Sequence, residues 1–122
     1  MAPKRDPSLD TLLALDGQMF FVDAAARYWV KFDVRETPAT QERSHGLIYS
    51  LTLHGPSGER LVGFDNAHAV RSSSGPGGKV AEHDHRHRLQ TVRPYRYRDA
   101  AVLLADFWAE VDTVLREKGV TR

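Results

Sequence analysis

The chain has 122 residues, 41% of them hydrophobic, and a formal net charge of +1. These values predict a single domain with one hydrophobic core over residues 1–122, and they argue against a protein that binds nucleic acid with its whole surface. The chain contains no cysteine, which excludes disulfides, thiolate zinc sites and a cysteine nucleophile.

No segment of the sequence has the pattern of a targeting or membrane segment. Residues 1–7 carry charge and lack the apolar stretch of a signal peptide, and we expect them to be disordered. The longest apolar runs are much shorter than the roughly 20 residues that a membrane span requires. The sequence therefore predicts a cytoplasmic protein that does not bind membranes.

Four segments of the first half of the chain are predicted to be β-strands. Residues 19–22 look extended, and residues 26–35 alternate between apolar and polar side chains, as a half-buried strand does. Residues 47–53 and 59–66 also have strand patterns, and the short glycine-containing turn between them is typical of a hairpin. Residues 8–15 fit a short helix capped at its first residue as well as they fit a strand.

The C-terminal segment 99–119 has the strongest helix signal in the chain. Its apolar residues recur at helical spacing, Asp99 is a suitable N-cap, and Gly119 can end the helix. Residues 67–81 contain a tract of serine, glycine and proline and are predicted to form a flexible loop. The expected fold is α+β, with an antiparallel sheet of about four strands packed by one long C-terminal helix.

Trp29 interrupts the alternation of its strand, because it lies among charged residues on the polar face. An indole left in water forgoes roughly 1.5–3 kcal/mol of possible burial, so we expect something to cover it. One hypothesis is that residues 9–15 fold over this face. The other is that Trp29 belongs to an interface with a partner protein or a second subunit.

Three histidines are concentrated in the sequence EHDHRH, which spans residues 82–87. On a strand, His83, His85 and His87 would share one face, and Asp84 and Arg86 would lie on the other. Histidine suits the two proton transfers of RNA cleavage, and arginine, which stays protonated, suits the phosphate. The pattern therefore fits a ribonucleolytic site that uses His85 and His87 as base and acid and needs no metal.

The same histidines also fit a metal site. From His83, His85 and His87 the strand could supply two ligands to a divalent ion such as zinc or nickel, with Asp65 or Glu82 as a third ligand. The neighbouring arginines would repel such an ion, which favours chemistry without a cofactor. A third interpretation is a non-catalytic module that binds another protein, with these charged residues in a solvated loop.

A basic strip without acidic residues follows the histidines. Its tyrosines alternate with arginines, which offers rings for base stacking beside charges for phosphates. This pattern predicts substrate contacts from Arg93, Tyr95, Arg96, Tyr97 and Arg98.

Four short motifs of this chain occur in the order known from one protein family. They are Phe64-Asp65-Asn66, Asp84-His85-Arg86-His87, Pro94-Tyr95-Arg96-Tyr97 and the helical segment from Leu103 to Val111. In this arrangement the chain resembles the TumE-like toxins of type II toxin–antitoxin systems, or a closely related sister family. The resemblance covers roughly residues 26–115, with the motif-like matches in its second half.

The resemblance implies a toxin that inhibits growth by acting on RNA and that a cognate antitoxin neutralises, as a monomer or a homodimer. It directs attention to one catalytic and one substrate-binding group of residues. The expected catalytic residues are Asp65, Asp84, His85, Arg86 and His87. Asn66 joins the residues of the basic strip in the expected substrate-binding group.

Overall fold

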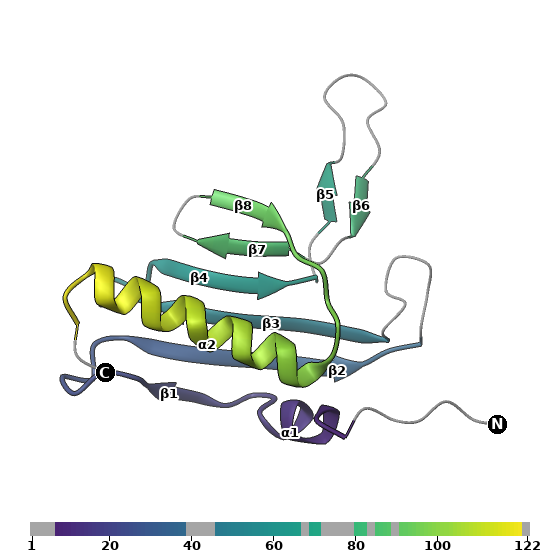
Figure 1. Ribbon diagram of the computed structural model, residues 1–122, viewed down its shortest axis with the longest axis horizontal. Coiled ribbons are helices and arrows are strands. Elements are labelled where there is room, and N and C mark those ends of the chain that lie inside the picture. The colour runs from purple at the N-terminus through teal and green to yellow at the C-terminus, as the bar shows by residue number, and fades with distance from the viewer. Residues whose placement is uncertain are drawn as a thin grey trace.

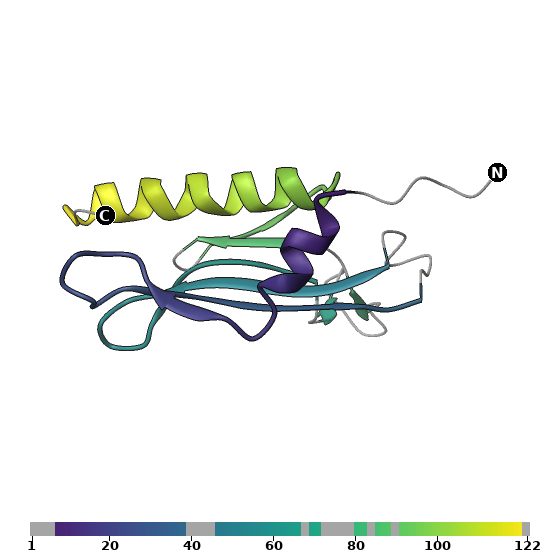
Figure 2. The same ribbon diagram turned by 90° about the horizontal axis from the view of Figure 1, so that it is seen from below.

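The computed structural model of the chain places an antiparallel sheet beneath one long helix (Figures 1 and 2). It describes residues 7–38, 46–66, 69–71, 80–82, 85–88 and 91–120. The sheet packed by this helix confirms the predicted α+β class. Of residues 1–7, which the sequence predicts to be disordered, all but Pro7 lie outside the described part of the chain.

The described strands form a six-stranded sheet in the order β1-β2-β3-β4-β7-β8, and each neighbouring pair is antiparallel. The four strands predicted from the sequence correspond to β1–β4, and two short strands extend the sheet. The bounds are β1 Met19–Phe21, β2 Trp29–Glu36, β3 Leu47–His54, β4 Arg60–Asp65, β7 His85–Arg88 and β8 Thr91–Pro94.

The segment predicted as a flexible loop, residues 67–81, contains a short paired element. Strand β5, Ala69–Arg71, pairs with β6, Val80–Glu82, in a separate two-stranded sheet. This ribbon follows β4 and precedes β7, so its two ends lie at the same end of the main sheet (Figure 1). The remaining residues of the predicted loop lie outside the described ones.

Helix α2, Ala100–Glu117, covers one face of the main sheet, which we call the helix face. Asp99 caps the helix as predicted, because its Oδ1 accepts a hydrogen bond of 2.8 Å from the backbone N–H of Val102. The apolar stripe of the helix is buried against the inward-facing side chains of β2–β4. The core residues of the helix are Ala100, Leu103, Phe107, Val111, Val114 and Leu115.

The ambiguous N-terminal segment forms a helix, α1, over Leu9–Ala14. Leu12 is buried in the core, and α1 approaches α2 at the edge of the sheet (Figure 2). Ser8 precedes α1 but makes no side-chain capping bond to it. Its hydroxyl instead accepts a hydrogen bond of 2.9 Å from the backbone N–H of Ala101, and so it satisfies a first-turn donor of α2.

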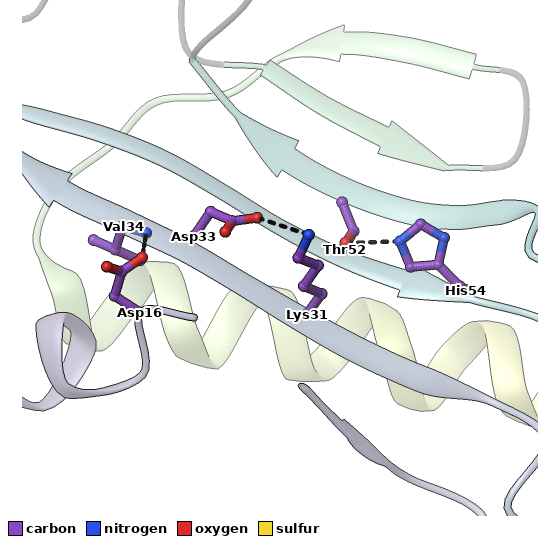
Figure 3. Close-up of polar contacts among 6 residues, drawn as sticks. All are labelled: Asp16, Lys31, Asp33, Val34, Thr52 and His54. Carbon is purple, nitrogen blue, oxygen red and sulfur yellow. Dashed lines mark hydrogen bonds and ion pairs between the residues drawn. The ribbon is translucent and has the colours of Figure 1, made fainter. Parts of the chain in front are cut away.

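Trp29 lies on the opposite face of the sheet, which we call the open face and which carries Lys31, Asp33, Thr52 and His54 (Figure 3). It is half-buried, and its ring stacks on that of His54, its cross-strand partner, at a centroid distance of 5.4 Å. The expectation that residues 9–15 cover Trp29 is wrong, because Leu12 enters the core on the other face. An interface role for Trp29 stays a prediction.

The connection between β1 and β2 is held by Asp23. Its Oδ1 accepts hydrogen bonds of 2.8 Å from the backbone N–H groups of Arg27 and Tyr28. Desolvation opposes ionisation of this carboxyl, but the hydrogen bonds from Tyr28 and Arg27 prevail and hold its pKa below the ordinary value. This turn fixes the position of β1 on the edge of β2.

Candidate functional site at the end of the sheet

The end of the sheet at which β4 finishes brings together segments that are distant in sequence. Asp65 is the last residue of β4, and it pairs with Ser50 of β3 on one side and with His85 of β7 on the other. His85 in turn pairs with Pro94, the last residue of β8. Two of the predicted motifs and the start of the third therefore meet at this end.

The carboxyl group of Asp65 is almost completely buried. The residue is 1% exposed, and it follows Phe64, whose ring packs in the core against Tyr95 and Phe107. Aspartate is among the residues least often buried in folded proteins, because its charge loses hydration. Its depth at the end of a strand therefore marks Asp65 as a residue with a specific structural or chemical role.

Asn66 continues the pairing of β4 with β3 one residue beyond the strand. Its Nδ2 donates to the carbonyl of Leu47 at 2.7 Å, and its Oδ1 accepts from the backbone N–H of Tyr49 at 2.9 Å. The backbone N–H of Asn66 also donates to the carbonyl of Tyr49 at 3.2 Å. The amide thus anchors the chain directly after Asp65, while the substrate contact expected from the sequence stays a prediction.

Strand register assigns the histidine positions to a row of the sheet. Positions 85 and 87 pair with Asp65 and Gly63, whereas position 86 pairs with Phe64. Because successive strand positions alternate between the faces, 85 and 87 belong to the rows of the open face and 86 to a row of the helix face. His83 and Asp84 lie outside the described residues, as do the side chains of His85, His87 and Arg93.

On the helix face, the basic strip, Arg86 and α2 line an open cavity of about 340 Å³, which we call the arginine pocket. Tyr95 is held there by a hydrogen bond of 2.6 Å from its hydroxyl to Oδ2 of Asp106. Arg86 Nη1 lies 3.9 Å from Oε1 of Glu110. The lining residues are Arg86, Tyr95, Arg96, Arg98, Val102 and Asp106.

The pocket is lined by several of the predicted binding residues, and two of its arginine side chains are exposed to solvent. Arg96 and Arg98 are exposed, so their guanidinium groups keep access to solvent and to a ligand. Tyr97 is half-buried and packs against Tyr49 with a centroid distance of 6.0 Å. The pocket therefore presents two exposed arginines beside the carboxyl group of Asp106, and phosphate binding by the arginines and base stacking by Tyr97 stay predictions.

Comparison with protein families adds a decisive observation. The model of the family described as Toxin TumE matches residues 11–115 of the chain. The chain belongs to the TumE toxin family. This membership makes it a toxin of a toxin–antitoxin system, with an antitoxin as its partner. No curated protein and no solved structure gives a significant match.

Asp106 completes the arginine pocket of this TumE toxin, although the sequence did not single it out as a site residue. It lies one helical turn after Val102, so both face the strip of residues that enters α2. The signal that could have identified it is the combination of this spacing with a tyrosine shortly before the helix. A buried or half-buried tyrosine hydroxyl usually has a hydrogen-bond partner.

Two further observations bear on the expected properties of the TumE toxin. Within the described residues, no group of three histidine, aspartate or glutamate side chains is arranged to hold a metal ion. Because His83 and the imidazoles of His85 and His87 are not among them, the alternative metal site stays a prediction. No helix of the described part is long and apolar enough to span a membrane.

Proposed function

We propose that this toxin acts on RNA and cleaves it, without a metal ion, at the end of the sheet where β4 meets β7. The observation that carries the proposal is the register that pairs the buried carboxylate Asp65 with His85. Directly opposed strand residues have Cβ atoms about 4.5–5.5 Å apart. That spacing lets a carboxylate accept a hydrogen bond from an imidazole and orient it for proton transfer.

The proposed reaction uses the RNA's own 2′-hydroxyl as the nucleophile. An imidazole takes the proton of that hydroxyl while its oxygen attacks the adjacent phosphorus atom. The bond from phosphorus to the 5′-oxygen of the next nucleotide breaks, and a second imidazole, which is protonated, donates its proton to the leaving oxygen. We assign these two proton transfers to His85 and His87, with Asp65 orienting His85. The products carry a 2′,3′-cyclic phosphate and a 5′-hydroxyl.

The arginine pocket has a binding role in this proposal. Position 86 and the pocket lie on the helix face, whereas Asp65 and position 85 belong to a row of the open face. An RNA strand that crosses the end of the sheet would place the scissile phosphate near Asp65 and a flanking phosphate in the pocket. Substitutions in the pocket should therefore weaken RNA binding more than they slow the cleavage step.

The purified protein is expected to cleave single-stranded RNA equally well before and after treatment with EDTA. Because one imidazole must be neutral and the other protonated, the rate should depend on pH with a bell-shaped profile. Cleavage, its pH dependence and the chemical ends of the products are measured on one synthetic RNA. Loss of cleavage on chelation, restored by stoichiometric zinc or nickel, would instead support the alternative metal-dependent hydrolase.

The double variant Arg96→Gln, Arg98→Gln is expected to bind single-stranded RNA more weakly and with a shallower salt dependence. Each phosphate contact contributes a slope of about −0.7 to the plot of log affinity against log salt concentration. Removing two contacts should therefore reduce the slope by roughly 1.4. Fluorescence anisotropy at several salt concentrations provides the measurement.

The double variant Arg116→Gln, Lys118→Gln is the matched control for this experiment, because it also removes two exposed cations, which lie at the C-terminal end of α2, far along the helix from the pocket. It should leave the slope unchanged. An equal reduction of the slope in the control and in the pocket variant would show that the whole surface charge, and not the arginine pocket, attracts RNA.

A further inference from the structure

Strand β1 forms one edge of the main sheet and carries an unusual set of side chains. It is the outermost strand in the order of the sheet (Figure 1). Met19 is 58% exposed, Phe20 40% and Phe21 54%. Of the large hydrophobic side chains in the described part of the chain, these three are the exposed ones, and they are consecutive in sequence.

The backbone of β1 also presents hydrogen-bonding groups away from the sheet. The N–H of Val22 donates to the carbonyl of Tyr28 at 3.0 Å, and the N–H of Phe32 donates to the carbonyl of Gln18 at 3.0 Å. In an antiparallel ladder, hydrogen-bonded pairs recur at every second residue, which places Phe20 and Val30 in such a pair. The N–H and C=O groups of Met19 and Phe21 therefore point away from β2.

An edge of this kind is a template for pairing with another strand. Proteins usually protect sheet edges with lysine, proline, a bulge or a covering segment. Within β1 itself none of these residue types occurs, because its sequence is Met-Phe-Phe. Exposed apolar side chains together with outward backbone groups provide both the packing surface and the hydrogen bonds of an added strand.

We propose that β1 pairs antiparallel with β1 of a second copy of this chain, around a two-fold axis at Phe20. In this register Met19 of each copy lies opposite Phe21 of the other, and their outward backbone groups form the hydrogen-bonded pairs. Phe20 lies opposite its own counterpart. The interface is isologous, as expected for a cyclic dimer.

The register is supported by how it distributes apolar and charged residues. It places all three apolar residues of β1 against apolar residues, which a shift by two positions in either direction does not. Asp16 and Asp23 lie in the turns before and after β1, outside the segment that pairs across the axis. The segment that pairs across the axis therefore contains no charged side chain that would have to be desolvated.

Both faces of the extended sheet would gain contacts in this dimer. On the helix face, the ring of Phe20 already packs on Trp108 and Phe32, with centroid distances of 6.1 and 5.7 Å. A second copy of Phe20 would enlarge this aromatic cluster across the axis. On the open face, Phe21 pairs in register with Trp29, so Met19 of the second copy would extend that row.

This inference does not depend on the proposed action on RNA, because its test measures only the size of the protein. A three-residue strand forms few contacts, so we expect a dimer that dissociates on dilution. The parent protein should sediment as a dimer at roughly 0.1 mM and shift toward monomer on dilution, as an affinity in the micromolar range implies.

Two variants and one control locate the interface. Met19→Pro removes an outward N–H but no bond to β2, and proline is tolerated on the outer side of an edge strand. Phe21→Lys places a charge on the edge. Each should raise the dissociation constant roughly tenfold or more, while thermal melting reports whether the variant is folded. Ala109→Lys, which adds the same charge on the exposed side of α2, should dimerise like the parent.

Three outcomes would overturn the proposal. The first is a parent protein that is monomeric at every concentration tested. The second is a parent that dimerises together with both folded edge variants, which would place the interface elsewhere. The third is a monomeric parent whose binding to its antitoxin is lost in Phe21→Lys, which would assign the β1 edge to the antitoxin.

Discussion

Replacing Asp65 by asparagine is expected to reduce RNA cleavage by about 100- to 10,000-fold and to abolish growth inhibition, because the catalytic imidazole of His85 loses the carboxylate that orients it. The substitution conserves the volume of the buried side chain but removes its negative charge. An amide can no longer stabilise a positively charged imidazole at position 85, and it can select the wrong tautomer. Cleavage of a synthetic RNA and growth after induced expression provide the measurements.

His85→Ala should have an effect similar to that of Asp65→Asn, because the two residues are proposed to act as a unit. The double variant should then lose little more activity than either single variant, since groups that act together are not additive. Circular dichroism and thermal melting of each variant establish that the sheet is intact. These controls separate a loss of chemistry from a loss of fold.

His54→Ala is the matched histidine control. His54 is on β3, four positions from Ser50, the residue that pairs with Asp65, and four strand residues span about 13 Å. Its ring stacks on that of Trp29. Its Nε2 lies 2.9 Å from the hydroxyl oxygen of Thr52 (Figure 3). Cleavage at the parental rate by folded Asp65→Asn, or an equal loss in His54→Ala, would contradict the proposed pair.

The sequence predicts those parts of the fold that have a clear hydrophobic period. The alternation of residues 26–35 and 47–53 corresponds to β2 and β3, and the helical period of residues 99–119 corresponds to α2. In each of these segments one face is buried, so the order of apolar and polar residues along the sequence indicates which side chains are buried. The assignment of positions 85 and 86 to opposite faces follows from the same alternation.

The remaining elements could not be predicted because their local sequences lack such a signal. Strand β7 has the sequence His-Arg-His-Arg and β8 contains proline and arginine, so neither shows apolar alternation. Strand β7 is held by pairing to β4, which is distant in sequence, and β8 is held in turn by pairing to β7. Helix α1 has six residues, too few for its periodicity to distinguish helix from strand.

The role of Asn66 is another feature that only the three-dimensional structure supplies. An Asp-Asn pair at the end of a strand is typical of turn chemistry, and the family motif suggested substrate binding. In the structure, the amide of Asn66 satisfies backbone groups of Leu47 and Tyr49 on β3, the strand that also pairs with Asp65. The fold thus uses one side chain of the motif to position another.

Asn66→Ala is accordingly expected to destabilise the protein by about 2–5 kcal/mol, because each buried group left without a partner costs roughly 1–3 kcal/mol. The substitution removes the donor for the carbonyl of Leu47 and the acceptor for the N–H of Tyr49, both at buried positions. Asn66→Asp should be comparably harmful, since it keeps the acceptor but places a carboxylate oxygen against the carbonyl of Leu47. Urea denaturation measures the free energy of unfolding.

Gln18→Ala is the matched amide control, because Gln18 is exposed and its removal should change the free energy of unfolding by less than about 0.5 kcal/mol. The two roles of Asn66 are separated at a low temperature at which the Asn66→Ala variant is folded. There, a purely structural Asn66 leaves RNA affinity close to the parental value. A folded variant with parental stability but weakened RNA binding would contradict the structural role and support the substrate contact that the sequence predicts.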